Sequence, residues 1–179
     1  MKYTQGLMRS TALILPLSLV ALPASAADVL EEIKNSDQFG TFSEAIEATD
    51  LKDTLDGEGP FTIFAPTDDA FDQLPEGAAD ELMKEENRDT LEALLRHHVV
   101  EGERLPSDAI PEKIEPMEGG EITAELSEGQ LTLSGGEEDD QGARVVQGDM
   151  PADNGVIHAV DSILITEDVQ ELLDEQQDD

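Results

Sequence analysis

The three histidines of this 179-residue chain are the side chains best suited to acid–base or metal chemistry. His97 and His98 are adjacent, so on a helix their side chains diverge by about 100° and do not share one ion. A site joining His98 to His158 and a carboxylate would lack the His-x-x-x-His or His-Glu-x-x-His spacing of metal-binding helices. We therefore predict no metal site. His98 continues an apolar helical stripe, and we assign it to the core with its ring hydrogen-bonded, while His97 points away from that stripe.

The other reactive groups also lack the patterns that catalysis or cofactor binding requires. The absence of Cys excludes thiol nucleophiles, disulfides and thiolate metal sites, and no Gly-x-Ser-x-Gly elbow occurs. The acidic runs at 137–140 and 174–179 lack calcium-loop spacing and are typical of solvated loops. Thr67 precedes Asp68 and Asp69, whose carboxylates would repel an anion, so Thr67 is expected to cap a helix. The sequence predicts no catalytic residue and no cofactor.

The charge of the chain limits its partners. Asp and Glu number 43 against 10 Lys and Arg, which gives a formal net charge of −33. Phosphate backbones are bound by clustered Lys and Arg, so nucleic acid is excluded as a partner. An acidic surface repels itself in dilute buffer and is tolerated where molar salt shortens the Debye length to about 3 Å. We read the charge as adaptation to high salt; the alternative is a low-affinity cation store.

Residues 1–26 have the pattern of a secretory signal peptide. Lys2 and Arg9 form a basic region, residues 11–22 are apolar, and residues 24–26 read Ala-Ser-Ala, which predicts cleavage between Ala26 and Ala27. The apolar stretch is shorter than the roughly 20 residues of a membrane span, so no membrane anchor is expected after cleavage. The product is then an exported domain, periplasmic or extracellular.

Helical patterns come first along the chain and alternating patterns follow. Capping-box spacing predicts helices after Asp28 and Thr41. Residues 61–65 follow, and they predict a strand that is apolar on both faces. A helix at 68–74 and a helical stripe at 91–98 come next. Later segments predict a hairpin of 122–126 with 131–133, a strand starting at 145–146, a strand at 156–165 after an Asn-Gly turn, and a helix after Thr166. This order favours an α+β fold over alternating βαβ units.

Three stretches, at 61–71, 94–102 and 154–164, together resemble the fasciclin (FAS1) family in sequence, order and spacing. The resemblance implies a compact wedge of short helices packed on a β-sandwich-like core. It divides the chain into a signal peptide at 1–26, a fasciclin domain at 27–165, and a short C-terminal helix with an acidic tail at 166–179. The motif positions expected to have structural roles are Phe64, Pro66, Thr67, Phe71, His98, Asn154, Gly155 and His158.

The same resemblance implies a secreted, non-enzymatic protein of cell-surface adhesion or matrix interaction. Its expected partner is a cell-surface or matrix protein or a polysaccharide, with divalent cations as a bridge to acidic polysaccharide. In some animal members a Tyr-His pair is implicated in integrin binding, and His97 stands here in place of that Tyr. The alternative hypothesis is a soluble periplasmic protein that binds a small ligand or a cation in a polar cavity near His98 or His158.

Overall fold

The computed structural model describes residues 27–135, 142–166 and 169–171. The predicted signal peptide, the acidic run at 137–140 and the acidic tail lie outside these residues. The helices are α1 (Val29–Asn35), α2 (Gly40–Ala48), α3 (Leu51–Leu55), α4 (Asp68–Asp72), α5 (Ala78–Leu82), a 3₁₀ turn (Glu85–Asn87) and α6 (Arg88–His97). The strands are β1 (Phe61–Pro66), β2 (Val99–Glu101), β3 (Lys113–Ile114), β4 (Ile122–Ser127), β5 (Gln130–Ser134), β6 (Ala143–Ala152) and β7 (Gly155–Val160).

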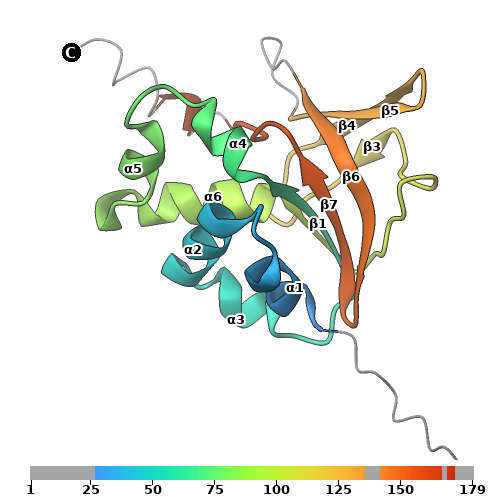
Figure 1. Ribbon diagram of the computed structural model, residues 1–179, viewed down its shortest axis with the longest axis horizontal. Helices are drawn as coiled ribbons and strands as arrows, with labels where there is room; N and C mark the ends of the chain where they lie inside the picture. Colours follow the sequence, from blue (N-terminus) through green and yellow to red (C-terminus); the bar gives the residue numbers. More distant parts are fainter. Residues whose placement is uncertain (1–26, 136–141, 167–168, 172–179) are drawn as a thin grey trace, which may run out of the picture.

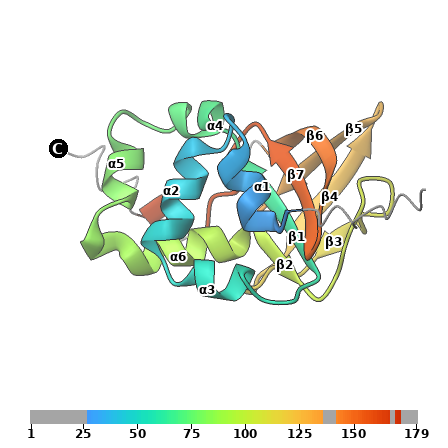
Figure 2. The same ribbon diagram turned by 60° about the horizontal axis from the view of Figure 1, so that its bottom comes forward.

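The strands form one sheet in the order β2-β1-β7-β6-β5-β4-β3. Strands β1 and β7 are parallel, with Phe61 opposite Gly155 and Pro66 opposite Val160, and the other neighbours are antiparallel. Figures 1 and 2 show the helices gathered on one side of β1 and β7 and the β3–β5 part of the sheet on the other. The α+β class and the helix-on-sheet architecture predicted from the sequence are confirmed.

The core consists of two apolar clusters separated by β1. Ile63 and Ala65 point into the cluster beneath the helices, whereas Phe64 points into the cluster enclosed by β3–β6. Successive side chains of a strand point to opposite faces, so a strand between two apolar layers carries apolar residues on both faces. This explains the apolar residues on both faces of 61–65 that the sequence pattern predicts. The one polar side chain, Thr62, is buried with its hydroxyl donating to the Glu103 carbonyl and accepting the Leu105 N–H.

Of the three helix caps predicted from the sequence, the structure confirms one and corrects two. The side chain of Asp28 does cap α1, accepting a hydrogen bond from the Glu31 N–H at 2.8 Å. Helix α2, however, begins at Gly40 and is capped from another element: the Asp68 carboxylate accepts hydrogen bonds from the N–H groups of Gly40 (3.3 Å) and Thr41 (2.8 Å). Thr67 occupies the N-cap position of α4, but its side chain makes no capping hydrogen bond.

The strand boundaries also differ from the pattern-based ones. Strand β7 ends at Val160 rather than at residue 165, because the chain bends there and the Leu164 N–H donates to His98 Nε2 at 3.0 Å instead of to a strand. Strand β6 is ten residues long and carries register shifts between Val145 and Met150. Residues 169–171 are helical, as predicted after Thr166. None of the described helices is long and apolar enough to cross a membrane.

Candidate functional site

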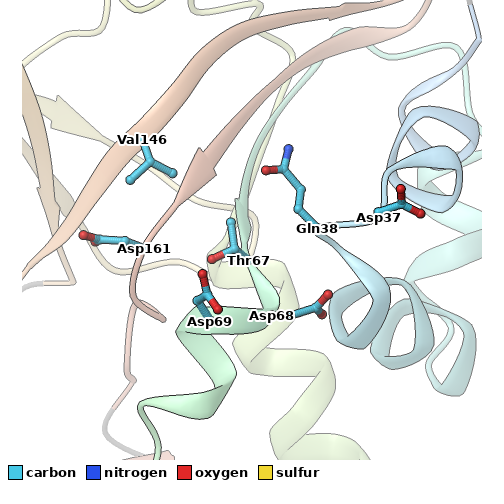
Figure 3. A pocket seen from close by; sticks show the side chains of 7 residues that line it. All are labelled: Asp37, Gln38, Thr67, Asp68, Asp69, Val146 and Asp161. Atoms are coloured by element: carbon cyan, nitrogen blue, oxygen red, sulfur yellow. The ribbon is translucent and has the colours of Figure 1, made fainter.

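A surface pocket lies where β1 and β7 end. Because the two strands are parallel, their carboxyl ends meet at the same edge of the sheet. This brings the start of α4 and the residue that follows β7 next to the α1–α2 connection and β6 (Figure 3). The pocket has a volume of about 470 Å³ and is lined by Asp37, Gln38, Thr67, Asp68, Asp69, Val146 and Asp161.

Two of the four carboxylates in this pocket are held by other parts of the protein. Asp68 accepts the two N–H groups at the start of α2. Asp161 accepts hydrogen bonds from the backbone N–H of Arg144 (2.8 Å) and from its Nε (2.9 Å), and it forms an ion pair with the same guanidinium at 2.9 Å. These two side chains build the walls of the pocket and have their charge partly satisfied.

The remaining groups of the pocket face solvent without such partners. Among the described residues, none hydrogen-bonds to or forms an ion pair with the carboxylates of Asp37 and Asp69, which are both exposed. No hydrogen-bond partner of the Thr67 hydroxyl occurs there either, although only 9% of this residue is exposed. Val146, 57% exposed, adds an apolar wall. The pocket therefore offers acceptors for a cation beside an apolar surface.

The acidic groups do not converge on one ion. In the part of the chain that the structure describes, no group of three or more His, Asp or Glu residues is arranged to hold a metal. The prediction of no metal site stays a prediction for the whole chain, and the acidic runs at 137–140 and 174–179 lie outside the described residues.

His98 is a core residue with both ring nitrogens engaged. Its Nδ1–H donates to the Leu94 carbonyl at 2.8 Å, and its Nε2 accepts the Leu164 N–H at 3.0 Å. Burial lowers the pKa of His98 to about 4, so the ring is neutral at pH 7. His98 thus lies in the core with both ring nitrogens hydrogen-bonded to the backbone. His97, expected to point away from the apolar stripe, is also buried, and a Cβ atom at Gly120 would lie 3.8 Å from its Cε1.

His158 is likewise engaged on both sides. Its Nε2–H donates to the Leu105 carbonyl at 2.8 Å, its Nδ1 accepts the Asp149 N–H at 3.2 Å, and its ring stacks on Phe64. Burial lowers its pKa. The Ser107 hydroxyl donates to the Asp149 carboxylate, which lowers the pKa of Asp149, and not to the histidine. The three residues tie the loop after β2 to β6 and β7, and they do not form a nucleophile–base pair.

Asn154 joins four segments of the chain. Its Oδ1 accepts the Val29 N–H at 2.9 Å, and its Nδ2 donates to the carbonyls of Leu55 (2.9 Å) and Gly57 (3.0 Å). Its own carbonyl accepts the Phe61 N–H at 2.9 Å. At Gly155 a Cβ atom would lie 2.5 Å from the Phe61 carbonyl oxygen, so only glycine allows this approach. Both residues are structural.

Most of the residues in the sequence motifs thus lie in the core or in turns and strands, and few of them line the pocket. Phe64 and Phe71 are buried in the two cores, and Pro66 ends β1 opposite Val160. Of the eight motif positions only Thr67 lines the pocket. Sequence reasoning missed Asp37, Gln38, Val146 and Asp161 as pocket residues. The sequence does predict two apolar strands before these residues. It does not show that the two strands are parallel neighbours and therefore end at the same edge of the sheet.

Comparison with known proteins places residues 37–166 within the Fasciclin domain family model. The chain is 34% identical over 141 residues to Protein sll1483 of Synechocystis sp., a match that covers 79% of this chain and 74% of that protein. It is 28% identical to human Periostin over 146 residues, which are 79% of this chain but 16% of Periostin.

A solved structure shares the fold. It is the FAS1 domain pair of the insect cell adhesion molecule Fasciclin I, matched with a TM-score of 0.67 at 16% identity. The match covers 80% of this chain and 52% of that chain, so this chain corresponds to about half of the domain pair.

Proposed function

This chain belongs to the fasciclin domain family, and on that basis we propose that it is an exported, non-enzymatic protein of cell-surface adhesion or matrix interaction. Proteins of this family are commonly connected with adhesion or the extracellular matrix. The observation that carries the proposal is the family match across residues 37–166, nearly the whole described domain.

The state of the reactive side chains supports a role in recognition rather than catalysis. His98 and His158 have both ring nitrogens hydrogen-bonded within the fold, and the Ser107 hydroxyl is directed to Asp149. A general base needs a ring nitrogen within reach of a substrate proton. These groups hold the domain together, and the same contacts give no support to the small-ligand alternative at the histidines.

The proposed partner is a cell-surface or matrix protein or a polysaccharide, and not a nucleic acid, because of the net charge of −33. In this proposal, cleavage between Ala26 and Ala27 releases the domain to the periplasm or the medium. Molar salt screens the repulsion between its carboxylates, and divalent cations bridge single surface carboxylates to acidic polysaccharide.

The test is binding of the fluorescently labelled protein to intact cells and envelope fractions, in dilute buffer and in 1 M salt, with and without calcium. Saturable binding that persists in 1 M salt is the expected result. Absence of binding under every condition, with the protein folded by circular dichroism, would rule out adhesion.

A further inference from the structure

We propose that the pocket at the ends of β1 and β7 binds a lysine or arginine side chain of a protein partner. The cationic group would be held by the Asp69 carboxylate and the Thr67 hydroxyl, and the hydrocarbon stem would lie against Val146. Asp37 and Gln38 provide further acceptors on the opposite side of Thr67 (Figure 3). The inference rests on the proposed function only in assigning the basic side chain to an adhesion partner.

The Thr67 hydroxyl is the observation that distinguishes this pocket from an ordinary acidic surface. Thr67 is nine-tenths buried, and it takes the N-cap position of α4 without making the capping hydrogen bond. Within the described residues its hydroxyl has no other partner, and Figure 3 shows it on the side of Asp69. The hydroxyl is not one of the fully buried atoms without a partner, so it is reached from the pocket, where a ligand group can hydrogen-bond to it in place of water.

The arrangement of charge selects the kind of cation. The pocket residues do not form a group that could hold a metal ion, and Asp68 and Asp161 already have internal partners. The exposed carboxylates of Asp37 and Asp69 remain for a ligand. Lysine and arginine combine a charged end with an apolar stem, and such side chains place the stem on apolar surface while the charge meets polar groups. Val146 provides that surface beside the carboxylates.

Binding of capped peptides in 1 M salt tests the proposal. At that ionic strength the Debye length is about 3 Å, so attraction to the general negative charge is screened and direct contacts remain. Capped Gly-Gly-Lys-Gly-Gly and Gly-Gly-Arg-Gly-Gly are titrated into the ¹⁵N-labelled protein, with the norleucine peptide as the uncharged control. We expect saturable shifts of the backbone amide signals of Thr67, Asp69 and Val146 with both basic peptides and none with norleucine. Equal shifts with norleucine, or no saturation with either basic peptide, would overturn the proposal.

Matched variants locate the binding. Asp69→Asn should weaken binding about two- to fivefold, the range of an exposed ion pair. Asp89→Asn should leave it unchanged, because Asp89 is also an exposed carboxylate in the first turn of a helix but lies on α6, outside the pocket. Thr67→Val, which removes the hydroxyl at nearly constant volume, should weaken binding about two- to tenfold. An equal effect of the Asp69 and Asp89 substitutions would place the binding elsewhere and overturn the proposal.

A second pair of variants separates this inference from the adhesion proposal. Val146→Lys places a basic side chain at the pocket and should abolish peptide binding, whereas Leu126→Lys, at another large exposed apolar residue, should not. If Val146→Lys leaves envelope binding unchanged, adhesion stands and the pocket proposal is wrong. If the peptides bind as expected but the protein binds no envelope fraction, the pocket chemistry stands and adhesion is wrong.

Discussion

Replacing Asn154 by Ala should destabilise the domain more than any other substitution of an asparagine. The side chain makes three hydrogen bonds, to the backbone of Val29, Leu55 and Gly57, at 2.9 to 3.0 Å. At a net value of about 1 kcal/mol for each hydrogen bond, the loss is about 3 kcal/mol of unfolding free energy. For a domain of this size that corresponds to a fall in melting temperature of about 6 to 12 °C.

The chain contains three asparagines, and the other two serve as graded controls. Asn87 makes one side-chain hydrogen bond, to the Glu81 carbonyl at 2.8 Å, so Asn87→Ala should cost about 1 kcal/mol. Within the described part of the chain nothing hydrogen-bonds to the side chain of Asn35, so Asn35→Ala should change stability by less than about 0.5 kcal/mol.

Urea denaturation followed by far-UV circular dichroism in 1 M salt measures the series. The order expected from the hydrogen-bond counts is Asn154→Ala, then Asn87→Ala, then Asn35→Ala. Equal losses for the three variants, or a loss below about 1 kcal/mol at Asn154, would refute the assignment of this side chain as the tie between β7, α1 and the end of α3.

Three further outcomes follow from the structure. The pKa of His98 is lowered to about 4 in the folded protein, so its contribution to stability is complete above the unfolded value of about 6.5 and is lost as the pH falls towards 4. The melting temperature should fall across this window, less steeply in His98→Gln; an unchanged slope in the variant would contradict the burial of a neutral ring. Gly155→Ala should cost about 1 to 3 kcal/mol in urea titrations, because its Cβ would meet the Phe61 carbonyl at 2.5 Å; a variant as stable as the parent would show that the strands do not approach so closely. The melting temperature should rise markedly between dilute buffer and 1 M salt, and a flat response would remove the argument for adaptation to high salt.

Local patterns predicted the elements whose determinants lie within a few residues. Asp28 and the Glu31 N–H are one turn apart, so the sequence was enough to place the cap of α1. The hairpin of β4 and β5 was also recognised from alternation, and its turn residues Glu128 and Gly129 both have positive φ. These features depend on neighbours along the chain, and tertiary contacts do not change them.

Predictions failed where a partner comes from a distant segment. The cap of α2 is Asp68, 27 residues beyond Thr41, and no local pattern could distinguish this arrangement from a cap by Thr41 itself. His97 was expected to point away from the apolar stripe, but it is buried, and a Cβ atom at Gly120 would lie 3.8 Å from its Cε1. An apolar stripe of helical period marks only one buried face of a helix, whereas α6 also buries His97, which lies off that stripe.

The sequence by itself determined the α+β class, most of the elements and the motifs that identify the family, because hydrophobic period, turn residues and motif spacing are local properties of the chain. The tertiary structure alone decided that β1 and β7 are parallel, and it thereby brought Thr67 and Asp69 together with Val146 and Asp161. Thr67 and Asp161 are 94 positions apart, and no periodicity encodes which strand ends share an edge. That choice is made by the packing of two apolar layers against the same pair of strands.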